Sequence, residues 1–127
     1  MSEIVYDTGA LLAAERRDVG LWALHAELIA ADTIPIVPVP VLAQGWRGGP
    51  QPLVSRLLGT CRIVPMVEDA GRAAGAACGA SGTSDVVDAA VVVTAAAVRA
   101  AAIVTSDPDD LEAIAGALGL RIRMRTV

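Results

Sequence analysis

Residues 4–11, with the sequence Ile4-Val5-Tyr6-Asp7-Thr8-Gly9-Ala10-Leu11, contain a junction between a strand and a helix with an acid at its centre. The apolar run before Asp7 predicts a short buried strand, and Thr8 or Gly9 begins a helix that runs to about residue 17. Ligands of open α/β sheets bind outside the carboxyl ends of the strands. Asp7 is therefore the first candidate for a functional side chain.

Strand and helix patterns alternate along the rest of the chain. Short apolar runs predict further strands at residues 34–37, 62–64, 102–105 and 121–125. Helical spacing, together with proline and glycine at helix ends, predicts helices at residues 21–31, 41–47, 53–58, 68–80, 85–99 and 108–118. This alternation is typical of an α/β fold with a mostly parallel sheet, and no linker, repeat or second domain interrupts it. We expect residues 1–127 to form one domain.

The composition constrains both the core and the partners. The chain has 127 residues, of which 54% are hydrophobic, but only one Tyr, two Trp and no Phe. Its core must therefore be built from Ala, Val, Leu and Ile, which suit helices packed closely on a parallel sheet. The formal net charge of −4 argues against a protein that grips nucleic acid by overall basicity, although a local arginine patch can still serve.

The sequence indicates neither a zinc site nor a membrane segment. Cys61 and Cys78 are too few and too far apart for a zinc site. The first residues lack the basic region of a signal peptide, and the apolar stretch 86–102 is interrupted by Thr94 and Arg99. We therefore expect a reduced, cytoplasmic protein with no membrane partner.

Acidic side chains recur where strands end and helices begin. Carboxylates gathered at one sheet edge repel each other unless a cation lies among them, and a divalent metal used for phosphodiester chemistry is the natural candidate. Helix capping is the structural alternative, because Asp is a preferred N-cap residue. Taken singly, Asp85 and Asp107 are explained by capping at least as well as by metal binding. Asp88 would then be a capping-box-like partner of Asp85, and Pro108 after Asp107 suits the first position of a helix. The acids concerned are Asp7, Asp85, Asp88, Asp107, Asp109 and Asp110.

Three of these acids lie in segments that resemble the acidic motifs of PIN-domain ribonucleases, and most closely those of VapC-type toxins of type II toxin–antitoxin modules. The resemblance covers essentially the whole chain in the family's order. It implies a three-layer α/β/α fold with a roughly five-stranded, mostly parallel sheet. The segments are Val5-Tyr6-Asp7-Thr8-Gly9-Ala10-Leu11, Asp88-Ala89-Ala90-Val91-Val92-Val93-Thr94-Ala95 and Val104-Thr105-Ser106-Asp107-Pro108-Asp109-Asp110-Leu111.

The resemblance also implies a metal site. It makes Asp7, Asp88 and Asp107 the acids that hold Mg²⁺, with Mn²⁺ as the alternative ion, and it implies RNA cleavage by a metal-activated water. The family usually carries a Glu on the helix after the second strand. Here the matching residue is Gln44, a catalytic candidate that offers a neutral oxygen but no charge. We expect Asp85, which lies one helical turn before Asp88, to supply the missing charge as a further metal ligand.

Neighbouring polar residues are expected to assist the acids. Thr8, Ser106 and Asp110 are candidates to hydrogen-bond a metal-bound water or a ligating carboxylate, and helix capping explains Thr8 at least as well. Arg17 and Arg47 are candidates to bind the substrate.

Several other residues have expectations of their own. Trp46 is expected in the core or in a dimer interface, and stacking on an RNA base is the alternative. His25, the only histidine, is far from every motif and is expected to be a partly exposed surface residue outside the chemistry. Three arginines alternate on the predicted last strand and so share one face, which serves either RNA binding or a solvated sheet edge. They are Arg121, Arg123 and Arg125.

The resemblance implies a Mg²⁺-dependent endoribonuclease toxin with an RNA substrate, a VapB-like antitoxin partner and a homodimeric state. The alternative is a PIN-fold protein with a degenerate site, marked by Gln44, that acts mainly by binding antitoxin or RNA. Two other α/β families fit less well. A response-regulator receiver would need a lysine, which this chain lacks, and a Rossmann-type nucleotide binder would need a glycine-rich turn where only Gly9 is present.

Overall fold

The computed structural model describes residues 2–127. Within these residues, five short strands are interspersed with seven helices. The strands are β1 (Ile4–Tyr6), β2 (Ile36–Pro38), β3 (Arg62–Val64), β4 (Ala102–Thr105) and β5 (Met124–Thr126). The helices are α1 (Thr8–Glu15), α2 (Val19–Ala30), α3 (Val39–Gly45), α4 (Pro52–Leu58), α5 (Glu68–Ser81), α6 (Val86–Ala97) and α7 (Pro108–Ala117).

The five strands form one parallel sheet in the order β3-β2-β1-β4-β5. The chain builds outward from β1 through β2 to β3, and then returns to place β4 on the other side of β1. The strand order therefore reverses between β1 and β4. In open α/β sheets this switch point leaves a crevice at the carboxyl ends of the two strands, and ligands bind there.

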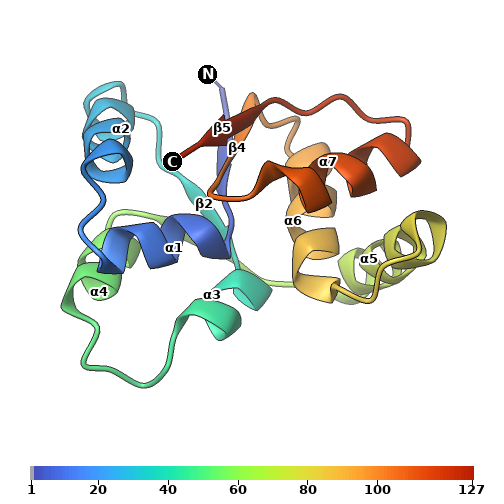
Figure 1. Cartoon of the computed structure of the whole chain (residues 1–127), viewed down its shortest axis with the longest axis horizontal. Helices are drawn as coiled ribbons and strands as arrows, with labels where there is room; N and C mark the ends of the chain where they lie inside the picture. Colours follow the sequence, from blue (N-terminus) through green and yellow to red (C-terminus); the bar gives the residue numbers. More distant parts are fainter. Residues whose placement is uncertain (1) are drawn as a thin grey trace.

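Helices cover both faces of the sheet, as the expected three-layer arrangement requires. Figure 1 shows α1, α2 and α4 on one side of the strands and α5, α6 and α7 on the other, with α3 beyond the end of β2. The central strands are accordingly buried: Val5, Tyr6, Ile36, Val37 and Ile103 have no exposed surface. Continuous burial of this kind is the pattern expected of parallel strands that have helices on both faces.

The core is built from small aliphatic side chains, as the composition predicted. The buried face of α6 consists of Ala89, Ala90, Val91, Val92 and Ala95. Short side chains let a helix axis approach the sheet closely, because the separation of packed elements depends on the side chains between them. This close approach brings the beginning of α6 toward the end of β1.

No single helix within residues 2–127 is long and apolar enough to cross a membrane. The helices α5 and α6 reach that length and composition only when taken together, and the two are bent by 113° at their break.

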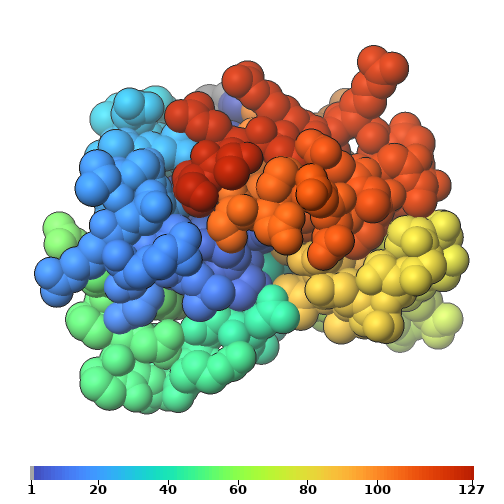
Figure 2. Space-filling model, viewed as in Figure 1, coloured from blue at the N-terminus to red at the C-terminus, as the bar shows by residue number. Residues whose placement is uncertain are grey.

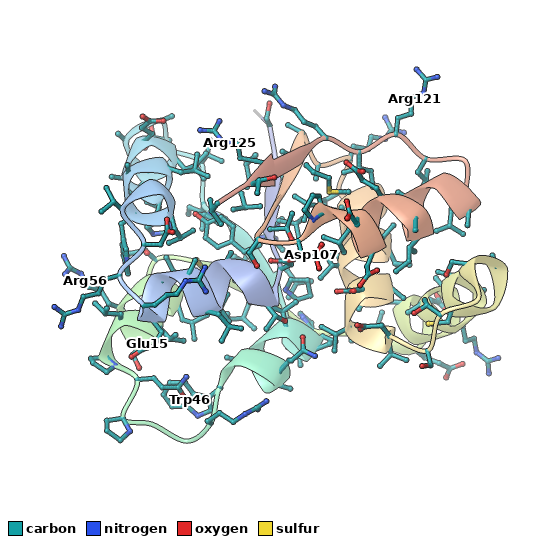
Figure 3. All side chains as sticks on the ribbon, viewed as in Figure 1. Glu15, Trp46, Arg56, Asp107, Arg121 and Arg125 are labelled. Atoms are coloured by element: carbon teal, nitrogen blue, oxygen red, sulfur yellow. The ribbon has the colours of Figure 1, made fainter. Side chains whose placement is uncertain are left out.

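The prediction for the last strand is wrong about the residue at which the strand begins. The sequence predicted a strand over residues 121–125, whereas β5 begins at Met124, where it pairs with Ile103. The reason is that β4 has only four residues, so its edge partner can pair only over that length. Of the three arginines assigned to this strand only Arg125 belongs to it, although all three are exposed, and Arg121 and Arg125 project from the same side in Figure 3.

The expectation of a partly exposed His25 is also wrong. The imidazole is only 5% exposed and lies between β1 and the turn after α4. Its Nδ1 is 2.8 Å from the Tyr6 hydroxyl oxygen, and its Nε2 is 2.7 Å from Oγ1 of Thr60. The sequence could not indicate this position, because its two partners are 19 and 35 residues away.

The surrounding hydrogen bonds determine which nitrogen of His25 carries the proton. The Thr60 hydroxyl donates its hydrogen to the carbonyl oxygen of Leu57 at 2.9 Å, so its oxygen must accept from Nε2 of His25. The Nδ1 atom is then an acceptor for the Tyr6 hydroxyl. Burial lowers the pKa of His25, and the neutral ring completes this chain of hydrogen bonds.

We predict that His25 makes the fold less stable as the pH falls. The pKa of His25 is lowered in the folded chain, so the unfolded chain binds the proton more readily. The contribution of His25 to folding stability is therefore complete above the ordinary pKa of about 6.5 and is lost as the pH falls below it. Protonation places a second donor against the Tyr6 hydroxyl, and an unsatisfied buried donor costs about 1–3 kcal/mol.

The measurement is urea unfolding of the wild-type chain and of His25→Leu at a pH well above and a pH well below the histidine pKa. The wild type should lose more stability on acidification than the variant does. Equal losses in both chains would contradict the assignment of the neutral ring.

Candidate metal centre

Asp7 lies at the carboxyl end of β1, where the sequence predicted a functional acid. The residue is 7% exposed, and its carboxylate Oδ1 accepts a hydrogen bond from the backbone N–H of Ala10 at 3.1 Å, which makes Asp7 the N-cap of α1. Burial raises the pKa of Asp7. The Thr105 hydroxyl and two backbone N–H groups act in the opposite direction, and the charge of Asp107 raises the pKa further.

Asp107 reaches the same edge of the sheet from β4. The backbone N–H of Asp7 donates to the carbonyl oxygen of Val104 at 3.1 Å, which extends the pairing of β1 and β4 to the acid itself. The backbone N–H of Asp107 donates to Oγ1 of Thr105 at 3.0 Å, and the Asp107 carboxylate caps α7 through the N–H of Asp109. Adjacent strand ends thus bring together two acids that are a hundred residues apart.

Gly9 allows the two strand ends to lie against each other. A Cβ atom at this position would clash with the side chain of Ser106, would lie 2.9 Å from its backbone nitrogen and would lie 3.1 Å from Oδ1 of Asp7. Only a residue without a side chain fits between α1 and the segment that leads from β4 into α7. Gly9 is therefore a packing requirement of the site.

Asp85 and Asp88 enter from the other face of the sheet at the beginning of α6. Asp85 caps this helix, since its Oδ1 accepts from the backbone N–H of Asp88 at 3.0 Å. The backbone N–H of Asp85 donates to Oγ1 of Thr83, and no reciprocal bond from the Asp88 side chain is formed. The capping prediction is thus confirmed for Asp85, although the full capping box is not formed.

The electrostatic centre of the group is Asp88. Its pKa is raised to about 7, first by burial, then by the charge of Asp85 and a side-chain hydrogen bond with it, and then by the charges of Asp7 and Asp110. Acids at the beginnings of α1, α6 and α7 all raise the pKa of Asp88, so its carboxyl group lies near the place where these three helices begin. Figure 2 shows the corresponding segments meeting around a shallow hollow at the middle of one face.

The donor set fits a hard divalent cation in its chemistry. Among residues 2–127, no three His, Cys, Asp or Glu side chains converge closely enough in their present rotamers to enclose a metal ion. The capping bonds of Asp7, Asp85 and Asp107 each use only Oδ1, so capping by itself does not occupy the second carboxylate oxygen of these residues. Carboxylate oxygens are the ligands preferred by Mg²⁺ and Mn²⁺, and the raised pKa of Asp88 marks a position where positive charge would be stabilising.

The remaining residues predicted to assist the acids are placed at the same edge. Thr8 is the first residue of α1, and its hydroxyl donates to Oε1 of Gln44 at 2.6 Å instead of capping the helix. Ser106 lies against Gly9, and Asp110 is close enough to raise the pKa of Asp88. The structure therefore places Gln44 of α3 beside the carboxyl end of β1, at the same edge as the carboxyl end of β4 and the beginning of α6.

The arginines predicted to bind substrate are less close to the acids. Arg17 follows the end of α1, and the eight residues of this helix separate it from Asp7 by about 12 Å at 1.5 Å per residue. The Arg47 guanidinium donates to the carbonyl oxygens of Ala43 and Trp46, which are at the end of α3. Figure 3 shows Asp107 near the middle of the face, with Arg56, Arg121 and Arg125 toward its periphery.

Trp46 does not lie in the core. Its side chain is 37% exposed and lies beside Gly49 in the turn after α3. A fully buried position, one of the two expected from the sequence, is therefore wrong for this residue.

Sequence reasoning missed two threonines that fix the acids. Thr105 has no exposed surface, and its hydroxyl accepts from the N–H of Asp107; Thr83 does the same for Asp85. The signal was present, because the pattern Thr-Ser-Asp-x-x-Asp occurs twice, at residues 83–88 and 105–110. A hydroxyl that bonds the backbone two residues on, followed by an Asp cap, is a local device for beginning a helix.

One cavity lies away from the acids. It has a volume of about 180 Å³ and is lined mainly by apolar side chains of α2, β1 and β4, together with Arg123 and Arg125. None of the acids at the sheet edge lines this cavity.

We predict that Gly9→Ala destabilises the protein. The added methyl group overlaps Ser106 and Asp7, and overpacking of this kind costs about 1–3 kcal/mol. Gly116→Ala in α7 is the matched control, because nothing lies within 4 Å of its Cβ position, and replacing a helical glycine there should stabilise by about 0.5–1 kcal/mol. Urea unfolding of both variants measures the difference. A Gly9→Ala chain as stable as the wild type would contradict the close approach.

We further predict that Asp88→Asn stabilises the metal-free protein above pH 7. The pKa of Asp88 is raised in the fold from 3.8 to about 7, so the folded chain holds this proton more tightly than the unfolded chain does. Stability is therefore lost progressively as the pH rises from 3.8 to about 7, and the whole loss is present above pH 7. Because Asp88 is partly exposed, solvent screening reduces the effect to about 1 kcal/mol.

Thermal unfolding in a chelator at pH 8 and at pH 5 tests this prediction, and the gain from Asp88→Asn should be larger at pH 8 than at pH 5. Adding Mg²⁺ at pH 8 should raise the unfolding temperature of the wild type, because a ligand that binds only the folded chain stabilises it. The variant should respond less. An equal response of both chains would exclude Asp88 from any metal site.

The comparison with known proteins supports the fold. The fold resembles that of a chain in the crystal structure of VapBC2 from Rickettsia felis bound to a DNA fragment from the VapBC2 promoter. That chain superposes on this one with a TM-score of 0.72. The alignment covers 98% of this chain and 98% of that chain at 14% sequence identity. No protein-family model and no curated protein matches the sequence. The similarity therefore establishes the architecture: the chain has a PIN-like α/β/α fold with a five-stranded, wholly parallel sheet.

Proposed function

We propose that this protein is a metal-dependent endoribonuclease and the toxin of a VapBC-type toxin–antitoxin module that acts in the cytoplasm. The observation that supports the proposal most directly is the placement of Asp7 and Asp107 at the adjacent ends of β1 and β4, with Asp88 near enough to Asp7 for the charge of Asp7 to raise its pKa. The three carboxylates come from three separate elements near the edge where an α/β sheet binds its ligands, and in this proposal Mg²⁺ or Mn²⁺ would draw them together and offset their mutual repulsion.

The chain's own residues have distinct tasks in this proposal. Asp7, Asp88 and Asp107 hold the ion, and Asp85 contributes further negative charge from the beginning of α6. When bound, the ion lowers the pKa of a coordinated water and stabilises negative charge on the scissile phosphate. Thr105 holds the backbone of Asp107 in place, and Gly9 keeps the Asp107 segment against Asp7.

The proposed partners are an RNA substrate and a VapB-like antitoxin. The neighbouring structure is a VapBC2 complex bound to DNA, and the shared architecture supports an antitoxin partner for this chain. A second copy of the chain is a further proposed partner, because large apolar side chains remain exposed; they include Val19, Ile34, Val67 and Val86.

A second candidate function is binding without cleavage. It is favoured by Gln44, which stands where the resembled family usually carries a glutamate and which removes one negative charge from the site. In that case the chain binds RNA or an antitoxin through the same edge of the sheet, and the acids serve mainly as helix caps.

Cleavage of a fluorescent single-stranded RNA by the purified chain, in Mg²⁺ and in a chelator, tests the first function against the second. The decisive variant is Asp7→Asn, because asparagine caps a helix as well as aspartate does but lacks its charge. We expect Mg²⁺-dependent cleavage that falls by about 100-fold or more in this variant, the scale on which removal of one electrostatic group acts on a charged transition state.

Asp18→Asn is the matched control. Asp18 caps α2 through the N–H of Leu21 at 2.8 Å, just as Asp7 caps α1, but it lies outside the acidic group. This variant should cleave RNA like the wild type. If the RNA is bound but stays intact in Mg²⁺, the binding function is supported and the nuclease is not.

A further inference from the structure

The hydrogen bond between Thr8 and Gln44 determines how the amide of Gln44 is oriented. The two oxygen atoms are 2.6 Å apart. An amide oxygen can only accept a hydrogen bond, so the hydroxyl must be the donor. The Thr8 hydroxyl therefore donates to Oε1, and the amide nitrogen of Gln44 faces away from Thr8.

The chain's two glutamines differ in how their amides are satisfied. Gln51 uses both ends within the protein: its oxygen accepts from the N–H of Arg47 at 2.7 Å, and its nitrogen donates to the carbonyl oxygen of Gly45 at 2.9 Å. Gln44 uses only its oxygen, and no acceptor within residues 2–127 takes the hydrogens of its nitrogen. Gln44 thus presents two N–H donors at the surface from an orientation that Thr8 fixes.

The position of these donors relates them to the acids. Thr8 directly follows Asp7, and α3, which carries Gln44, packs against both α1 and α6. The amide of Gln44 therefore lies beside the first residue of α1, and the helix that carries it also contacts α6, the helix of Asp88. An N–H donor is repelled by a cation and attracted by an anion, so this position suits an anionic oxygen of the substrate better than it suits a metal.

We propose that Gln44 binds a non-bridging phosphate oxygen of the RNA strand through its amide nitrogen, and that Thr8 is the positioning residue that orients the amide. This inference rests on the proposed nuclease function. An RNA phosphate that approaches a group of carboxylates is repelled by them, and a neutral donor at their rim offsets part of that repulsion. Replacement of the usual glutamate would then exchange a charge that attracts metal for a donor that attracts substrate.

Two binding measurements on the intact chain test the proposal. The first is the fluorescence anisotropy of a short fluorescein-labelled single-stranded RNA of mixed sequence, in Ca²⁺ at low temperature, with a gel to verify that the RNA remains intact. The second is the Mn²⁺ affinity, measured by electron paramagnetic resonance without RNA. Gln44→Ala should weaken RNA binding by about tenfold and leave Mn²⁺ affinity unchanged.

Substitutions at Thr8 separate positioning from a structural role. Thr8→Ser keeps the hydroxyl and should bind RNA like the wild type, whereas Thr8→Val should weaken RNA binding toward the level of Gln44→Ala. The double variant Thr8→Val with Gln44→Ala should bind RNA no more weakly than Gln44→Ala alone, because both changes remove the same contact. Gln44→Glu should bind Mn²⁺ more tightly and RNA more weakly than the wild type.

Failure of this inference differs from failure of the proposed function. If the wild type binds Mn²⁺ and cleaves RNA, but Gln44→Ala binds RNA normally or loses Mn²⁺ affinity, Gln44 is not a phosphate ligand. If the wild type binds neither Mn²⁺ nor RNA, the nuclease proposal and the inference both fail.

Discussion

The parallel pairing of β1 with β4 is the contact on which the rest of the molecule depends. Through it the backbone N–H of Asp7 bonds to Val104, so the beginnings of α1 and α7 lie side by side although most of the chain separates them. The remaining strands extend the sheet on either side, and the crossovers cover its two faces. Without this pairing the acids would belong to unrelated loops. The site is thus a property of topology more than of any local motif.

Like charges at one point oppose folding, and the structure offsets this cost through the backbone. Three of the acids each satisfy an N–H group at the beginning of a helix, and the positive end of a helix dipole favours a nearby carboxylate. Asp88 has no such role as a cap, and its pKa carries the clearest sign of the repulsion. Capping is therefore compatible with a second use of the same side chains, because each capping bond occupies only one of the two carboxylate oxygens.

Much of the architecture could be predicted because it depends on local patterns. The strands β1, β3 and β4 occupy the residues predicted for them, and proline and glycine place most helix ends within two residues. The beginning of β5 could not be predicted, because the length of a strand at the sheet edge depends on its partner. His25 escaped prediction for a related reason: its burial depends on Tyr6 and Thr60, which only the tertiary fold brings to it. Thr8 bonds Gln44 instead of its own helix for the same reason.

The threonine and aspartate pairs that begin α6 and α7 have a consequence for how such a protein can change over time. Each pair needs a hydroxyl, a backbone N–H and one side-chain oxygen, and an amide side chain supplies that oxygen as well as a carboxylate does. Exchange of a single oxygen for nitrogen at Asp85 or Asp107 would therefore remove charge and leave the helices intact. Selection for folding and selection for chemistry act on different atoms of one residue. A single Asp-to-Asn substitution could therefore give a homologue that folds normally but has lost the charge on which its chemistry would depend.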